Sequence, residues 1–211
     1  MMVPVDRLSS LLERFRISTR MSFSGLMCGK HVFAENNNKA YLHVMRRGVM
    51  EVRHPGAKGV PTRIKLDQPS LIFYPRPFTH HFYNTPRDGS DFTCAEIAFE
   101  GDLTHPILQA LPPFVVLRLD EVEGLQASLN LLFAETENVR CGHRVLADRL
   151  FEVVLIQLLR WLLDHPTHAN ISSGLLMGLS SPQLAKALTA MHESPGAPWT
   201  VEQLAEVSGM S

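Results

Sequence analysis

The sequence predicts an α+β fold, in which an antiparallel β-barrel or sandwich is followed by a helical region. From about residue 21 to residue 118, short apolar or alternating segments are separated by turn clusters, and short strands at near-regular spacing are typical of a sandwich or barrel. From about residue 121 onward, apolar residues recur at helical spacing instead. The change of period near residue 120 therefore divides the chain into a strand-rich part and a helical part.

The strand-rich part is preceded by a short helix within residues 1–20. The apolar face of this helix would consist of Val5, Leu8, Leu11, Leu12 and Phe15. Turn clusters rich in Asn, Pro and Gly are expected at residues 35–39, 54–59 and 85–90. These turns separate the predicted strands from one another.

Three helices are expected in the second part of the chain, ahead of its last residues. The first is marked by Leu125, Leu129, Leu132 and Phe133. The second runs from Val145 to Leu163 and ends before Pro166. The third begins at Pro182, with Ser181 as its N-cap, and extends to His192, because proline is favoured in the first helical turn.

Residues 199–211 have the pattern of the first half of a helix-turn-helix motif. Thr200 is the expected N-cap, and Gln203 follows at the spacing of a capping box. Gly209 suits the sharp turn that precedes a recognition helix. The second helix of the motif does not follow before Ser211. We therefore expect the sensory part of a transcription factor that stops within its first helix-turn-helix.

Composition narrows the class of protein. The formal net charge of −1 gives this stretch no basic field for nucleic acid. Three cysteines form no dense disulfide framework, which is typical of a reducing cytoplasm. The start of the chain lacks the features of a signal peptide, and the longest apolar run, Val153–Leu163, is broken by Gln157 and Arg160. We expect a cytoplasmic protein with no membrane partner.

Two segments of the strand-rich part resemble the motifs of the cupin family. Pro75–Asn84 has the form P-x-G-x-x-H-x-x-x-N, with Pro77 in place of the glycine and Asp67 upstream where a cupin has its Gly-Asp turn. Tyr41–Gly48 resembles the strand and turn of the first cupin motif, although the usual His-x-His and Glu are missing. The resemblance covers about residues 21–100 and implies an antiparallel double-stranded β-helix barrel.

Over its whole length the chain resembles the AraC/XylS-type transcriptional regulators, and among them the subgroup whose N-terminal cupin carries a Cys-Gly motif. The segments that carry the resemblance are Gly25–His31, Leu42–Val44, His80, Cys94, Leu111-Pro112, Leu158–Arg160, Met191-His192 and Trp199–Ser211. The resemblance implies a cupin sensor with a short N-terminal helix over residues 1–120. It further implies a helical linker used for dimerisation over residues 121–180, and the start of a DNA-binding domain over residues 181–211.

A zinc site is predicted from Cys28, His43, His80 and Cys94, which lie in predicted strands or at their ends. Two thiolates and two imidazoles suit a tetrahedral zinc ion. The period of two places His43 on one face with Met45, and His80 on one face with Phe78 and Phe82. In the alternative interpretation the cysteines are small buried hydrophobes and His43 is a hydrogen-bonded core residue. The cupin resemblance favours the metal, with one zinc ion per chain.

Other residues that could bind a ligand or a partner are given structural interpretations where these suffice. His31 and His81 should face away from the predicted site, and Cys141 lies outside the barrel. Arg46 and Arg47 form either an anion site or, as we favour, a solvated turn. The 145–163 helix is apolar over a wide arc, which indicates a domain-packing helix or a dimer seam. The arc consists of Leu146, Leu150, Val153, Val154, Gln157, Leu158 and Trp161. We favour the seam and expect a homodimer.

Three classes of function compete. The first is the effector-sensing domain of a regulator that would act on promoter DNA through the part following Ser211, with a small-molecule effector. The second is a metal-dependent cupin enzyme of the dioxygenase or isomerase type, and the third is a cupin that only contacts other proteins. A closed four-ligand zinc site leaves no open position for a substrate, so we expect no catalytic residues. The helix-turn-helix pattern favours the regulator.

Overall fold

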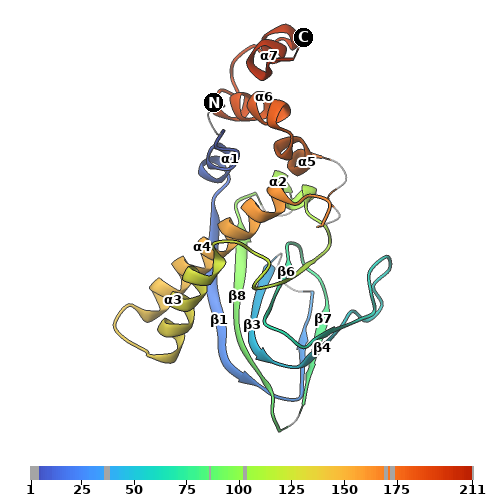
Figure 1. Cartoon of the computed structure of the whole chain (residues 1–211), viewed down its shortest axis with the longest axis vertical. Helices are drawn as coiled ribbons and strands as arrows, with labels where there is room; N and C mark the ends of the chain where they lie inside the picture. The colour runs from blue at the N-terminus through green and yellow to red at the C-terminus, as the bar shows by residue number, and fades with distance from the viewer. Residues whose placement is uncertain are drawn as a thin grey trace.

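The computed structural model describes residues 5–35, 39–85, 87–101, 104–168, 171 and 174–210. Strands dominate up to residue 118 and helices follow, as expected for the predicted α+β fold (Figure 1). In chain order the elements are α1 (Ser9–Arg14), β1 (Ile17–Met27), β2 (Lys30–Phe33), β3 (Ala40–Gly48), β4 (Met50–Arg53), β5 (Arg63–Leu66), β6 (Ser70–Tyr74), β7 (His80–Asn84), β8 (Ser90–Phe99), α2 (Pro106–Ala110), β9 (Val115–Arg118), α3 (Leu125–Glu137), α4 (His143–Asp164), α5 (Leu175–Ser180), α6 (Pro182–Glu193) and α7 (Val201–Ser208).

The strands form two antiparallel sheets. Sheet A has the order β1-β8-β3-β6-β9, and sheet B has the order β2-β7-β4-β5. The chain passes from sheet A to sheet B between β1 and β2, and the inner faces of the two sheets enclose a common interior. The predicted antiparallel cupin-type fold is therefore confirmed as a two-sheet β-sandwich. Of the turn expected at residues 35–39, residues 36–38 lie outside the described residues, as does Ser211.

The central strands β3 and β6 of sheet A are buried on both of their faces. All five residues of β6 are buried, and so are the neighbours Leu42, His43, Val44 and Met45 of β3, which point alternately to the two faces. Leu42 and Val44 belong to one hydrophobic cluster with the helices. His43 and Met45 point to the interior between the sheets, where Met45 belongs to a second cluster. A strand buried on both faces has continuous apolar character, which explains the run in β6.

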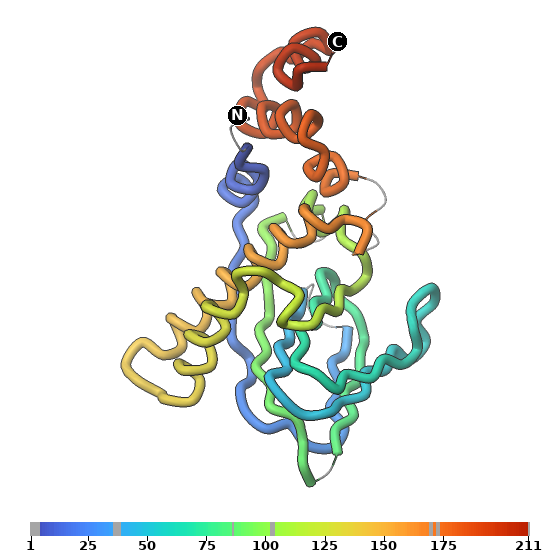
Figure 2. Tube along the Cα trace, in the orientation of Figure 1, coloured from blue at the N-terminus to red at the C-terminus, as the bar shows by residue number. Residues whose placement is uncertain are grey.

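Helices α3 and α4 form an antiparallel hairpin that lies beside sheet A and projects from it (Figure 2). Both predicted helices are confirmed, with α4 extending to Asp164. Most of the apolar arc of α4, including Leu158 and Trp161, is buried in the chain's own core, whereas Leu146 and Val153 remain 47% and 41% exposed. The arc thus serves mainly as the domain-packing face. Within the described ranges, no helix combines the length and apolar character needed to cross a membrane.

The last helices begin where the sequence predicts. The Ser181 hydroxyl accepts a hydrogen bond from the backbone of Leu184 at the start of α6. At the start of α7 both hydrogen bonds of the capping box between Thr200 and Gln203 are present, and Gly209 ends the helix in the left-handed conformation. The expected N-terminal helix is shorter than residues 1–20, because β1 already begins at Ile17. Figure 2 shows α1 beside α6 at the end of the molecule that also holds α7.

Because sheet and helices share one hydrophobic cluster, a cavity on the α4 side should weaken the whole chain. Phe151 is fully buried in that cluster. We expect Phe151→Ala to lower the free energy of unfolding by about 3–5 kcal/mol in a single urea transition. Val145→Ala, at a side chain that is 66% exposed, should change it by less than about 0.5 kcal/mol. Separate transitions for strands and helices would contradict the shared core.

Candidate functional site

A buried polar trio lies in the interior between the two sheets. His43 of β3 and Cys94 of β8 are direct register partners, and His80 begins β7 on the opposite sheet. The His43 Nδ1 atom lies 3.0 Å from the Cys94 Sγ atom, and its Nε2 atom lies 3.0 Å from the Nε2 atom of His80. All three side chains are completely buried. The structure therefore brings together three of the four predicted ligands.

The hydrogen bonds of the trio fix one consistent set of protons. The Nδ1 atom of His80 lies 2.8 Å from the carbonyl oxygen of Phe78, which can only accept, so His80 carries its proton there. Its Nε2 atom then accepts from the Nε2–H of His43. The Nδ1 atom of His43 in turn accepts from the Cys94 thiol. The three groups form a neutral chain in which each donor has an acceptor.

Aromatic rings fill the space around the two imidazoles. The ring of Tyr74 stacks on His80 with centroids 3.9 Å apart, and Phe33 stacks on His80 at 4.8 Å. Tyr41 stacks on His43 at 5.8 Å, while Phe82 meets His43 edge-on at 4.8 Å. The trio therefore sits in a buried interior lined by aromatic rings.

Burial keeps the trio uncharged. Desolvation lowers the pKa of His43 well below its usual value, and a nearby charge on His80 would lower it further. Desolvation also lowers the pKa of His80 to about 3, against a smaller opposing effect of the Phe78 carbonyl. The pKa of the Cys94 thiol is raised by its burial. At neutral pH both imidazoles and the thiol are therefore neutral.

A second buried pair adjoins the trio and was not predicted from the sequence. The Nδ1 atom of His54 lies 2.7 Å from the carbonyl oxygen of Pro61, so its Nε2 atom accepts from the Tyr74 hydroxyl at 2.9 Å. His54 follows β4 directly and was assigned to a turn cluster because a proline and a glycine come after it. His54 stands two residues after Val52 and four after Met50, which are both buried. This alternation was the sequence signal that His54 points into the interior.

Cys28 does not join the trio. Its Sγ atom lies beside Gly89, where an added Cβ atom would come within 2.7 Å of it. The adjacent Met27 pairs with Ser90, four residues before Cys94 on β8, which corresponds to about 13 Å along the strand. The expectation that Cys28 shares one site with the other three does not match this position. His81 is half-buried and alternates away from His80, as expected. The expectation for His31 was wrong, because His31 pairs with the buried Phe82 on the inner side of sheet B, and its Nε2 atom lies 2.8 Å from the carbonyl oxygen of Cys28.

The donors of the trio lie in a row and do not surround a point. Cys94 and His80 contact opposite ring nitrogens of His43, so one ion cannot reach all three as they stand. Among the residues that the structure describes, no group of three or more His, Cys, Asp or Glu is arranged to hold a metal ion. The two Nε2 atoms, however, are near the roughly 3.3 Å expected for two nitrogens on one tetrahedral zinc. The residues therefore fit a zinc ion in part.

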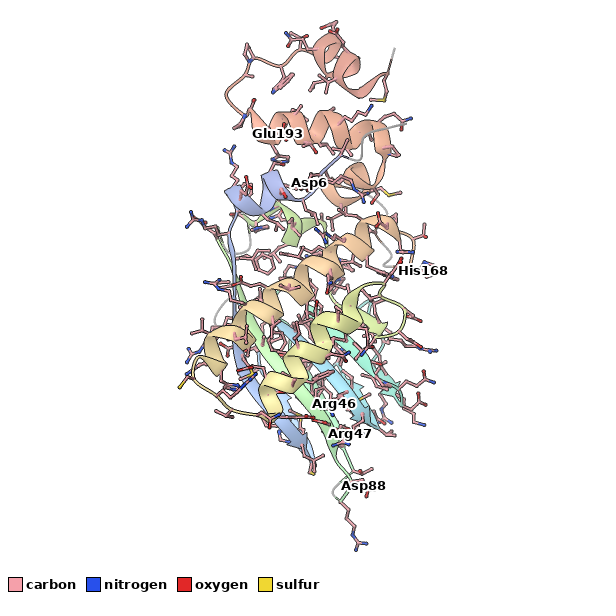
Figure 3. The ribbon with its side chains drawn as sticks, turned by 60° about the vertical axis from the view of Figure 1, so that its left-hand side comes forward. Asp6, Arg46, Arg47, Asp88, His168 and Glu193 are labelled. Atoms are coloured by element: carbon pink, nitrogen blue, oxygen red, sulfur yellow. The ribbon has the colours of Figure 1, made fainter. Side chains whose placement is uncertain are left out.

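Arg46 forms a junction between the sandwich and α3, next to the more exposed Arg47 (Figure 3). Its guanidinium is hydrogen-bonded to Glu137 at the end of α3 and lies 5.1 Å from the ring centroid of Phe133. Its Nε atom is 3.9 Å from a carboxylate oxygen of Asp91 on β8. Only Arg47 matches the expected solvated turn, since Arg46 connects three elements.

A family model described as Cupin matches residues 6–164, which is most of the chain. This chain belongs to the cupin family. The matched range includes both sheets, the trio and the α3–α4 hairpin. The cupin therefore comprises the helices that cover sheet A as well as the sandwich itself.

Curated relatives of this cupin are named as transcription regulators. An AraC-like transcription regulator of Streptomyces lividans is 34% identical over 107 residues, which cover 50% of this chain and 34% of the relative. The HTH-type transcriptional regulator AlkR of Acinetobacter baylyi is 32% identical over 110 residues, covering 50% of this chain and 35% of the relative. The matched stretch thus spans about a third of the length of these relatives. Their names confirm the resemblance of this chain to AraC-type regulators.

Solved structures show a remote likeness. ToxT from Vibrio cholerae O395 superposes with a TM-score of 0.41 at 8% sequence identity, covering 94% of this cupin and 71% of that chain. A second structure of ToxT, bound to an unsaturated fatty acid, superposes with a TM-score of 0.42 at 6% identity and covers 93% and 74% of the two chains.

The neutral trio predicts a loss of stability in acid. An unfolded histidine binds a proton below about pH 6.5, whereas folded His43 and His80 stay neutral. Stability should be full above about pH 6.5 and fall as the pH drops toward 3, by up to about 1.4 kcal/mol per pH unit for each residue. Urea unfolding of chelator-treated protein measures this slope.

One variant tests whether His80 contributes to this slope. His80→Gln should reduce the acid slope by about one proton, because an amide does not titrate in this range. An unchanged slope in His80→Gln would show that His80 is not held neutral by the fold.

Proposed function

We propose that this chain is the effector-sensing region of an AraC-type DNA-binding transcriptional regulator of the cytoplasm. The observation that carries the proposal is the kinship of half the chain with proteins named as such regulators. The capping box and glycine cap of α7 support it, because they match the start of a helix-turn-helix. Promoter DNA would be bound through the helix-turn-helix motif to which α7 belongs.

The alternative of a metal-dependent cupin enzyme has less support. A catalytic metal site keeps an open position for water or substrate. The trio is completely buried and enclosed by stacked rings, so a substrate would have to displace part of the core. A purely structural cupin would not need the capped α7 helix.

Transcript profiling tests the proposal. Disrupting the gene should change the transcripts of a small set of genes, and the wild-type gene should restore them. Leu204→Pro should not restore them, because proline inside α7 costs about 3 kcal/mol of helix stability and leaves the sandwich intact. Glu202→Gln is the matched control on the same helix. Full restoration by Leu204→Pro would favour the enzyme or the structural cupin.

We further propose that a small-molecule effector binds beside α3. A cavity of about 280 Å³ lies there, lined by Arg46, Gln68, Pro69, Leu119, Asp120, Gln126, Leu129, Asn130 and Phe133. It contacts both sheet A and α3, so an occupant would alter how the hairpin sits on the sheet. A larger groove of about 610 Å³ between α1 and α4 is lined by no strand residue and has no such connection to the sandwich.

A homodimer through the α3–α4 hairpin is our second proposal on partners. The hairpin carries exposed large hydrophobic side chains that the chain's own core does not cover: Leu131, Val139, Val145, Leu146 and Val153. Exposed apolar side chains gathered on a projecting element are typical of a protein interface. A second copy of the same hairpin would bury them in a two-fold arrangement.

Charged substitutions on the hairpin test the dimer. We expect a dimer mass in light scattering for the wild type and a monomer for Leu146→Glu combined with Val153→Glu. Val32→Glu, at a 55% exposed position on sheet B, should stay dimeric. Leu158→Glu should instead unfold the chain, because Leu158 is fully buried. A wild-type monomer at tens of micromolar would contradict the seam.

The zinc ion stays a prediction, now with His43, His80 and Cys94 as its ligands. Two features support it. The two Nε2 atoms face each other at 3.0 Å, and His80 donates its other N–H to a backbone carbonyl, as metal-bound histidines commonly do. The Cys94 side chain would have to turn from the Nδ1 side of His43. Zinc would supply folding stability by joining the two sheets.

Metal analysis decides the zinc prediction. We expect about one zinc ion per purified chain, a loss of zinc in Cys94→Ser, and a lower melting temperature on chelation. Cys28→Ser should keep the metal, because Cys28 lies away from the trio. Cys141→Ser, at an exposed loop cysteine, is a further control. Wild-type protein without metal, or zinc that depends on Cys28, would contradict this ligand set.

A further inference from the structure

The outer face of sheet B carries two rows of side chains that the strand register aligns. One row consists of Lys30, Tyr83, Glu51 and Lys65, and the other of Val32, His81, Arg53 and Arg63. These residues alternate with the buried ones along each strand, so all eight share the solvent side. Figure 1 shows the helices beside sheet A and at the upper end of the molecule, away from β4 and β7. We call these eight residues the sheet B face.

The sheet B face is basic although the chain as a whole has a net charge of −1. Lys30, Arg53, Arg63 and Lys65 face a single carboxylate within the two rows, that of Glu51. Glu51 is shared, since it is bonded to Arg53 and lies 3.9 Å from the Nε atom of Arg63. Asp67, just past β5, lies 3.7 Å from Lys65 and offsets part of its charge. The face therefore keeps a surplus of about two positive charges.

The cations are spread over a flat surface with an aromatic centre. Arg53 and Lys30 both lie over the ring of Tyr83, at 3.9 and 5.6 Å from its centroid. The edge residues Lys30 and Lys65 are three strand spacings apart, which is about 14 Å. Arg63 and Lys65 are 68% and 70% exposed. A surface of this width suits an extended partner better than a single small anion.

An acidic polypeptide fits this face better than a nucleic acid. Val32 is 55% exposed within one row and offers an apolar contact that phosphates cannot use. Glu51, near the middle of the face, would repel a continuous line of phosphates, whereas a peptide can place an uncharged residue opposite it. Strands β4 and β7 also lie well away from α7 (Figure 1).

We propose that the sheet B face is a docking surface for an acidic, partly apolar polypeptide segment of another protein. Its carboxylates would pair with Arg63, Lys65 and Lys30, and an apolar side chain would lie on Val32. Charge complementarity of this kind gives specificity and fast association. The proposal concerns a surface separate from the trio and from the α3–α4 hairpin, and it does not depend on the regulatory function.

Fluorescence anisotropy on the whole chain tests the proposal. The probe is a short labelled peptide of alternating glutamate and leucine, compared with its glutamine counterpart and with a labelled DNA duplex. We expect the glutamate peptide to bind with an affinity that falls with added salt, and the other two probes to bind far more weakly. Arg63→Glu combined with Lys65→Glu should weaken binding roughly tenfold.

The matched control is Arg16→Glu combined with Arg20→Glu, which changes the net charge equally at exposed positions outside sheet B. This control should bind within about twofold of the wild type. Arg63→Gln combined with Lys65→Gln provides a milder variant if the reversal disturbs folding. Equal binding of the glutamine peptide, or equal losses in both charge-reversed pairs, would overturn the proposal. DNA binding that matches the peptide and depends on Arg63 and Lys65 would overturn it too.

Discussion

The burial of the central strands of sheet A on both faces is the constraint on which the rest of the structure depends. One face encloses the interior with sheet B, and the other carries the helices, so Leu42 and His43 are both buried although they point in opposite directions. Removing the helices would expose Leu42, Val44 and Phe73, which belong to the same cluster as Leu132 and Phe151. Secondary structure changes near residue 120, but the hydrophobic core continues across that point.

This double burial also gives the interior a physical connection to the helices. His43 hydrogen-bonds Cys94 and His80 on the inner face of β3, while its neighbours Leu42 and Val44 contact the outer cluster. Close-packed cores transmit strain, because their side chains have little free volume in which to relax. A change in the trio therefore has a route of one residue along β3 to the side chains on which the hairpin rests. The interior and the α3–α4 hairpin are thus joined by packed side chains, with no hinge between them.

Features that depend on residues close together in the sequence were predicted correctly, whereas contacts between distant parts of the chain were not. The caps at Ser181 and Thr200 depend on residues at most three positions away, so their spacing suffices. The alternation of side chains along a strand correctly predicted that His43 and His80 point inward, because this alternation depends only on the strand itself. The distance between Cys28 and Cys94 depends instead on how β1 pairs with β8, where Cys94 lies opposite Phe23 and Ser90 lies opposite Met27. No spacing along the chain encodes that register.

The different burial of the two sheets also explains why the net charge of the chain does not predict the basic face of sheet B. Sheet B has one buried face, so every second residue of its strands is free to be charged, and Arg53, Arg63 and Lys65 occupy such positions. In sheet A the corresponding face is apolar because the helices cover it. The apolar hairpin and the basic face project from different parts of the molecule, as Figure 1 shows for α3 and for β4. A dimer formed through the hairpin would therefore leave both copies of the sheet B face open to a further partner.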